Sequence, residues 1–280
     1  MENILGSVWR KIVDKTIRLP MPWQLRDAVY QVTNLLSGAR YFKSKAEDRV
    51  LFLSNQIKDD GYVVIDNIPE IDADTLFEDI KKFYTNEELI ESSGINQKDG
   101  ELAGITYAGF EDLIDIRGVI DFCEHPLLLG VADEYLGCKS KIAGISSWKT
   151  KFLRNKASNA QQFHRDIDAL KWLKVFVYLT DVDDHNGPHV YVEKTHKLNR
   201  FISFRRIKDD EIVSSGLEEE HIKGLKGTVI VADSFGLHKG LAPKEGYRAI
   251  LQVTYCRDRL FMMAYPKNSQ LTGPRWKFFN

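Results

Sequence analysis

Two residues at strand-like spacing, His164 and Asp166, could bind a divalent metal ion side by side. In a β-strand the side chains of residues i and i+2 point to the same face. An imidazole and a carboxylate arranged in this way could occupy adjacent coordination positions of one metal ion. The triplet alone is a weak signal, because a chain with 7 histidines and 40 acidic residues contains one such match by chance about half the time.

A third candidate ligand and a candidate buried cation follow later in the chain. A predicted strand and a glycine-bearing turn lead to His238, which would complete the two-histidine, one-carboxylate triad of non-haem iron oxygenases. Ten residues later, Arg248 stands inside an apolar strand. A buried arginine needs an anion, which either a protein carboxylate or a ligand must supply. Beside the triad we favour a ligand, and the far carboxylate of 2-oxoglutarate suits a bidentate guanidinium.

With these residues in place, the sequence resembles the phytanoyl-CoA dioxygenase family of iron(II)/2-oxoglutarate-dependent oxygenases. The resemblance covers most of the chain from Gly61 onward. It rests on residues 61–67, His164-Arg165-Asp166, residues 177–182, Asn186-Gly187-Pro188, Thr195-His196-Lys197, His238 and Arg248. It implies a double-stranded β-helix (jelly-roll, cupin-like) core. It also implies that His164, Asp166 and His238 bind iron(II) and that Arg248 holds 2-oxoglutarate, with dioxygen as the other cosubstrate.

Three positions depart from the family's pattern. Arg165 replaces the common glutamine between two ligands, and an outward side chain there should not touch the metal. Residues 193–197 replace a Pro-Gly-Ser-His-Lys loop at the mouth of the site, a change that bears on the substrate. Ile250 stands where a hydroxyl residue often helps to bind the cosubstrate, so we assign that role to Tyr178 or Thr180.

The resemblance implies a dioxygenase that hydroxylates an unactivated C–H bond of a small or lipid-linked substrate. Asp166 favours hydroxylation over halogenation, because a small residue at this position in related enzymes frees a coordination position for halide. Two alternatives stay open. One is a non-redox cupin-type metalloenzyme such as a sugar isomerase, and the other is a jelly-roll ligand-binding module without turnover.

The remaining histidines have simpler interpretations. His185 and His189 flank the turn Asn186-Gly187-Pro188, and turn chemistry explains this stretch without a second metal site. His125 precedes a proline at a predicted helix start, and His221 lies in an acidic surface stretch. We expect no function for any of them.

The patterns along the chain indicate a single α+β domain with a helical N-terminal extension, residues 1–60, and a jelly-roll core, residues 61–280. Hydrophobic periodicity predicts helices at 3–17, 23–37, 45–58, 72–84 and 124–135. Short β-rich runs predict strands at 61–65, 142–153, 160–166, 172–179, 189–192, 228–232 and 248–255. A polar, glycine-containing stretch near 86–110 is predicted to be a long loop that serves as a lid.

The N-terminal extension is basic and amphipathic. Residues 1–45 contain eight basic and three acidic residues, and apolar residues recur at helical spacing in both predicted helices. The favoured interpretation is that these helices pack their apolar faces on the core. The alternative is peripheral contact with an anionic membrane. That alternative, with the basic series Lys149, Lys151, Arg154 and Lys156, suggests an anionic substrate such as a lipid-linked sugar.

Bulk composition narrows the class of protein. A formal net charge of −1 does not favour a nucleic-acid partner. Three cysteines without CxxC spacing favour a reducing compartment over a disulfide framework. Charges interrupt any signal-peptide core, and no apolar run reaches the roughly 18 residues that span a bilayer. We therefore expect a cytoplasmic protein. If the basic N-terminal helices bind a membrane, we expect peripheral contact at its inner face.

Overall fold

The structure, a computed structural model of the 280-residue chain, describes residues 21–37, 47–85, 105–152, 161–202, 205–258, 268, 271 and 273–279. The predicted helix at 3–17 and most of the predicted lid, residues 86–104, lie outside the described residues. No helix in the described part of the chain is long and apolar enough to cross a membrane.

Four predicted helices are confirmed, with shifted ends. The described helices are α2 (Trp23–Leu36), α3 (Asp48–Asp60), α4 (Ala73–Lys81), α7 (Phe110–Leu113), α8 (Arg117–Cys123), α9 (Pro126–Leu136) and α10 (Asp209–Ser214), with 3-10 helices η1 (Lys82–Thr85), η3 (Thr195–Lys197) and η4 (Pro274–Trp276). Local signals set the ends of two of them. The Asp72 side chain caps α4 by accepting hydrogen bonds from the amides of Asp74 and Thr75, and α9 begins with a proline and ends at Gly137.

The strands form two antiparallel sheets. The large sheet has the strand order β1-β7-β4-β9-β3-β2, and the small sheet has the order β6-β5-β8. The strands are β1 (Tyr62–Ile65), β2 (Ile105–Ala108), β3 (Lys141–Lys151), β4 (Trp172–Tyr178), β5 (His189–Val192), β6 (Glu219–Ile222), β7 (Val229–Ala232), β8 (His238–Gly240) and β9 (Tyr247–Cys256). Most neighbours in the sheets are distant in sequence, as in a jelly roll, so the predicted α+β fold with a jelly-roll core is confirmed.

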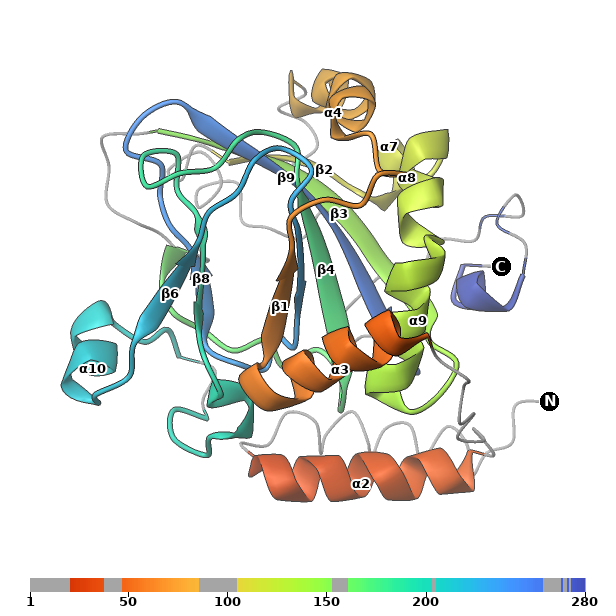
Figure 1. Cartoon of the computed structure of the whole chain (residues 1–280), viewed down its shortest axis with the longest axis vertical. Coiled ribbons are helices and arrows are strands. Elements are labelled where there is room, and N and C mark those ends of the chain that lie inside the picture. The colour runs from red at the N-terminus through yellow and green to blue at the C-terminus, as the bar shows by residue number, and fades with distance from the viewer. Residues whose placement is uncertain are drawn as a thin grey trace.

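Figure 1 shows these elements as layers, with the small sheet on one side of the large sheet and α8 and α9 on the other. Strand alternation sorts the side chains of β9 between the two sides. Ala249, Leu251 and Val253 join the main core, which includes the helices. Arg248 and Ile250 face the small sheet. The space between the two sheets is therefore where β9 places its one arginine.

Two predicted elements differ from the structure. In the predicted strand 160–166, the described residues 161–166 do not form a strand: Phe163 pairs with Ile207, whereas His164 pairs with His238. The backbone hydrogen bonds of this stretch thus go to two separate segments, and no continuous ladder forms. The predicted lid extends too far, because residues 105–108 form β2 and pair with β3.

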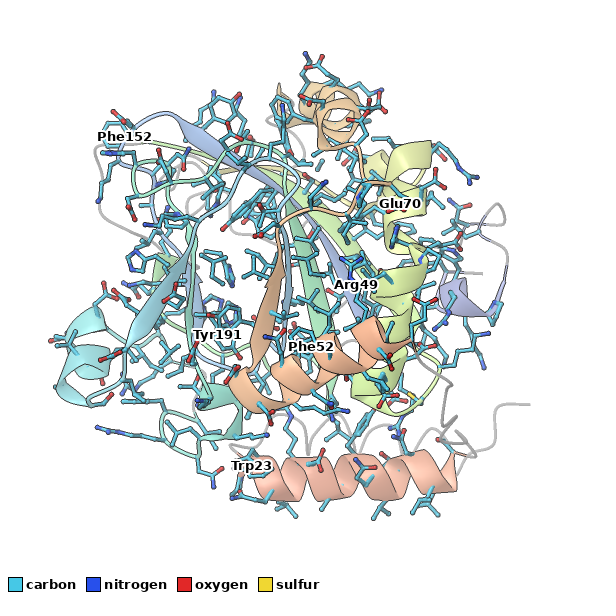
Figure 2. All side chains as sticks on the ribbon, in the orientation of Figure 1. Trp23, Arg49, Phe52, Glu70, Phe152 and Tyr191 are labelled. Carbon is cyan, nitrogen blue, oxygen red and sulfur yellow. The ribbon has the colours of Figure 1, made fainter. Side chains whose placement is uncertain are left out.

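The helix α2 packs on the core, as expected for the N-terminal extension, but it does so through a different face from the apolar one that its periodicity predicts. The helix buries polar side chains, including Arg26, and leaves four large apolar side chains exposed. The exposed residues, which we call the α2 stripe, are Leu25 (53%), Val32 (53%), Leu35 (80%) and Leu36 (73%). Hydrogen bonds anchor the inner face: Arg26 Nε donates to the carbonyl of Leu170 at 2.7 Å, and the Tyr30 hydroxyl donates to the carbonyl of Leu136 at 2.9 Å. Figure 2 shows side chains projecting from the side of α2 that faces away from the core.

Candidate metal centre

Backbone pairing brings the three candidate ligands together. The amides of His164 and His238 donate to each other's carbonyls, each at 3.0 Å, and the amide of Asp166 donates to the carbonyl of Ser234 at 2.9 Å. One ligand atom each from His164, Asp166 and His238 lies within 4.8 Å of the other two. The turn between Ser234 and His238 needs glycine at position 236, because a Cβ there would clash with the hydroxyl of Tyr191.

Backbone carbonyls determine which nitrogen of each imidazole faces the centre. The Nδ1 atoms of His164 and His238 each lie 2.9 Å from a carbonyl oxygen. Because a carbonyl oxygen only accepts, each Nδ1 carries a proton, and the Nε2 of a neutral imidazole keeps its lone pair. These Nε2 atoms lie 3.8 and 3.5 Å from the carboxylate oxygens of Asp166. Burial and the neighbouring His238 lower the pKa of His164 to about 3, so this imidazole is neutral at physiological pH.

A lysine supports the carboxylate of the centre. The ammonium of Lys174 lies 2.6 Å from Asp166 Oδ2 and 3.4 Å from Asp168, and its side chain is only 13% exposed. Burial alone would raise the pKa of Asp166, but Lys174 and His238 hold it well below its usual range. Asp166 is therefore ionised and ready to bind a cation. Sequence reasoning missed Lys174, whose only signal is a charge in an otherwise apolar strand.

Arg165 turns away from the three ligands, as expected, but it is buried instead of solvated. Its guanidinium donates to the carbonyls of Thr195 (2.7 Å), Leu198 (3.0 Å), Arg200 (3.0 Å) and Phe235. These contacts tie the loop after β5 to the turn that carries His238. Two cations lie over the ring of Phe235, with the guanidinium carbon of Arg165 5.0 Å and that of Arg26 4.1 Å from its centroid.

The three ligands line a cavity of about 190 Å³ between the two sheets. Apolar side chains from the large sheet form one wall: Tyr107 from β2, Trp148 from β3, Phe176 from β4 and Ile250 from β9. A larger cavity, of about 390 Å³, lies beneath α2 and contains no group of three potential metal ligands among the residues described. The smaller cavity is the candidate active site, because the ligands, the buried cations and an apolar wall converge there.

Arg248 lies in the same cavity and is 4% exposed. Its Nη1 donates to the carbonyl of Gly187, and its Nη2 lies 2.7 Å from where a Cβ on Gly240 would stand, so the small sheet leaves room for the guanidinium. Burial lowers the pKa of Arg248. Among the described residues no carboxylate lies within ion-pair distance of Arg248, and its Nε has no hydrogen-bond partner.

His189 also lines this cavity, which sequence reasoning did not foresee. The side chain is 6% exposed, and its ring centroid lies 5.0 Å from that of Phe176 and 5.7 Å from that of His238. Burial lowers its pKa well below the ordinary value, so the imidazole is neutral. The alternation of His189 and Tyr191 in the short strand β5 was the available signal, because residues at this spacing share one face.

Neither residue that we assigned to the missing hydroxyl role lines the cavity. The hydroxyl of Tyr178 donates to the carbonyl of Ile222 at 2.7 Å and accepts from the amide of His189 at 3.0 Å. The hydroxyl of Thr180 accepts from the amide of Ala249 at 3.2 Å, and this residue borders a different surface pocket. The assignment to Tyr178 or Thr180 is therefore withdrawn.

The basic series before the metal segment is not gathered at the cavity. Lys149 and Lys151 alternate along β3 with Trp148 and Thr150, which line the cavity, so the two lysines point to the other face of the sheet. Arg154 and Lys156 lie outside the described residues.

Comparisons with known proteins concern the fold. No protein-family model matches the chain, and a search of curated proteins gives no match. The non-haem alpha-ketoglutarate-dependent carbocyclase SnoK from nogalamycin biosynthesis is 17% identical, with a TM-score of 0.54 over 73% of this chain and 82% of SnoK. EctD from S. alaskensis, solved with 2-oxoglutarate and 5-hydroxyectoine, is 15% identical, with a TM-score of 0.57 over 77% of this chain and 78% of EctD. The epimerase SnoN is 18% identical, with a TM-score of 0.54 over 81% and 96%.

Proposed function

We propose that this protein is an iron(II)/2-oxoglutarate-dependent dioxygenase that hydroxylates a C–H bond of a small or lipid-linked substrate. The observation that carries the proposal is the position of Arg248. It is a buried cation without a described carboxylate partner, and it shares a cavity with two histidines and an aspartate of facial-triad type. A dicarboxylate that binds a metal at one end and a guanidinium at the other would satisfy both features.

The residues fit both groups. Two imidazole Nε2 atoms and an ionised carboxylate form the ligand set that suits non-haem iron(II), and the Nε of Arg248, which has no hydrogen-bond partner among the described residues, suits a carboxylate ligand. When bound, iron(II) and 2-oxoglutarate would activate dioxygen and supply the oxidising power for attack on a substrate C–H bond. Similar folds occur in EctD, solved with 2-oxoglutarate, and in SnoN, solved in complex with iron and alpha-ketoglutarate. The resemblance to the phytanoyl-CoA dioxygenase family stays a prediction within this class.

The chain's own residues have three tasks in this proposal. Lys174 keeps Asp166 ionised, and the carbonyls on the two Nδ1 atoms keep the imidazoles turned toward the metal. Arg248 orients the cosubstrate from the opposite end. The apolar wall of Trp148, Phe176 and Ile250 excludes water from the reacting atoms.

The two alternatives explain less. A non-redox cupin-type metalloenzyme such as a sugar isomerase accounts for the three metal ligands, but it leaves Arg248 without an anion among the residues that the structure describes. A binding module without turnover accounts for the cavity, but it does not require two imidazole Nε2 atoms and an ionised carboxylate that face one point. Succinate formation distinguishes both from the proposed dioxygenase.

The test uses anaerobically purified protein supplied with iron(II), 2-oxoglutarate and dioxygen, with succinate as the product measured. Arg248→Met should weaken 2-oxoglutarate binding by at least about thirtyfold, because truncating one partner of a buried charge pair costs about 2–5 kcal/mol. Iron(II) binding should be unchanged. Arg248→Lys keeps the positive charge but cannot form two parallel hydrogen bonds to a carboxylate. Its affinity for 2-oxoglutarate should therefore lie between those of the wild type and Arg248→Met. Wild-type protein that binds iron(II) but neither binds nor decarboxylates 2-oxoglutarate would show that the function is another one.

We also propose that the α2 stripe docks on an anionic membrane surface, which would give access to a lipid-linked substrate. Exposed apolar patches of this kind mark interaction sites, and residues 1–45 contain eight basic and three acidic residues, which suits anionic headgroups. The inner face of α2 is polar and already hydrogen bonded to the core. The stripe is therefore free for an external partner as far as the described residues go.

Vesicle flotation tests this surface. The variant Leu35→Ser/Leu36→Ser should lose most of the binding to vesicles that contain phosphatidylserine, with little change in stability, because both side chains are already exposed. Val213→Ser, which removes a 74% exposed apolar side chain from α10, is the matched control and should float like wild type. Equal flotation of all three proteins contradicts the membrane proposal. A wild-type dimer that the double variant converts to a monomer would identify the stripe as a subunit interface instead.

A further inference from the structure

His189 is a buried polar group that the proposed function has not yet used. Its Nε2 is buried and has no hydrogen-bond partner among the described residues. Leaving a buried polar atom unpaired costs about 1–3 kcal/mol, so such atoms in native proteins usually have an explanation. The side chain lines the cavity of the metal centre, so a ligand bound in that cavity could be the missing hydrogen-bond partner.

His189 is not a fourth metal ligand in this geometry. The group whose ligand atoms all lie within 4.8 Å of one another contains only His164, Asp166 and His238. The ring centroid of His189 lies 5.7 Å from that of His238. It therefore stands next to the metal centre and outside it.

The surroundings of His189 connect it to Arg248 instead. His189 on β5 pairs directly with Gly240 on β8, and the absent side chain of Gly240 leaves the space that the guanidinium of Arg248 occupies. The carbonyl of Gly187, two residues before His189, accepts a hydrogen bond from Arg248 Nη1. Two buried nitrogens without partners, Nε2 of His189 and Nε of Arg248, thus belong to neighbouring side chains in one cavity.

We propose that His189 anchors the distal carboxylate of 2-oxoglutarate together with Arg248, in the place of the hydroxyl that Ile250 cannot supply. This inference rests on the proposed function. A neutral imidazole donates one N–H, and a hydrogen bond from it to a carboxylate is charge-assisted. His189 is then a binding residue for the cosubstrate and a determinant of which 2-oxo acid the site accepts.

The test compares two 2-oxo acids on iron(II)-loaded protein under anaerobic conditions, with dissociation constants measured by calorimetry. The first is 2-oxoglutarate, and the second is 2-oxobutyrate, which shares the keto-acid end but lacks the distal carboxylate. His189→Leu should weaken 2-oxoglutarate binding about tenfold to a hundredfold, the range of a hydrogen bond to a charged group. Binding of 2-oxobutyrate and of iron(II) should be unchanged, a selectivity that a general loss of structure would not produce.

Two further variants complete the experiment. His189→Asn, whose shorter side chain does not reach the same position, should show the same selective loss and serves if the leucine variant does not fold. His185→Leu removes an exposed histidine of the preceding turn and should bind both acids like wild type. If both His189 variants bind 2-oxoglutarate with wild-type affinity, or lose affinity for the two acids equally, the role of His189 is overturned but the proposed function is not. A wild-type protein that binds neither acid overturns the proposed function as well.

Discussion

Asp166→Ala is expected to abolish iron(II) retention and, with it, 2-oxoglutarate turnover. The substitution removes the only anionic ligand of the three and leaves the ammonium of Lys174 facing the vacated position. Iron(II) affinity should fall by more than about a hundredfold, because loss of a mere outer-sphere partner already costs 10–100-fold. Metal content after dialysis and a metal titration measure the effect.

Two companion variants separate the charge from the ligand. Asp168→Ala removes the other carboxylate that contacts Lys174, at 3.4 Å, and should retain iron(II) because Asp168 is outside the ligand group. Asp166→Ala/Lys174→Met also removes the buried ammonium that has lost the closer of its two carboxylate partners, and it should recover part of the stability lost in Asp166→Ala without recovering metal. Iron(II) retention at the wild-type level in Asp166→Ala would falsify the assignment of the metal centre.

Arg165→Met is expected to lower the free energy of unfolding by about 3–5 kcal/mol, because four backbone carbonyls lose a charged donor and each buried acceptor left unsatisfied costs about 1–3 kcal/mol before relaxation. The guanidinium donates to four backbone carbonyls, and methionine of similar length supplies none of those donors. The turn that carries His238 would also lose one of its ties, so iron(II) affinity should fall together with stability. Urea unfolding at constant m-value and a metal titration measure the two effects.

Lys197→Met is the matched control, since Lys197 lies in the same loop region and its side chain is exposed. Its free energy of unfolding should stay within about 0.5 kcal/mol of wild type. Equal free energies of unfolding for the Arg165 and Lys197 variants would contradict this prediction. They would mean that water can replace the buried guanidinium of Arg165 without loss of stability.

The sequence predicted the grouping of the three candidate ligands from a local rule for two of them and, for His238, from its strand-and-turn context and the family resemblance. Residues 164 and 166 are two apart, and the glycine turn before His238 allows its backbone to pair with that of His164. The prediction of a strand at 160–166 was wrong because that stretch has no single neighbouring strand to pair with. Its backbone partners come from two distant segments, and no local pattern encodes that division.

Other parts of the site depend on contacts that a single sequence does not reveal. Tyr178 and Thr180 carry hydroxyls of the expected kind, but backbone groups of neighbouring strands already use them. His189 follows a turn, and turn chemistry explains that stretch of sequence. In the structure it is the first residue of β5, and its side chain lies between the two sheets. Helical periodicity located α2 but did not predict which face is buried. Arg26 and Tyr30 can lie on the buried face because they donate hydrogen bonds to core carbonyls, and the leucines then lie on the exposed face.

The contacts of Phe235 with both Arg26 and Arg165 mean that α2 cannot be removed without affecting the core. A chain shortened to begin at Gly61 would lose Arg26, so Phe235 would lose one of these two cations, and the carbonyls of Ala169 and Leu170 would lose their donor. Phe235 belongs to the turn that carries a candidate metal ligand. Deleting the helix would therefore confuse an effect on membrane binding with damage to the metal centre, whereas point substitutions in the α2 stripe keep the two apart.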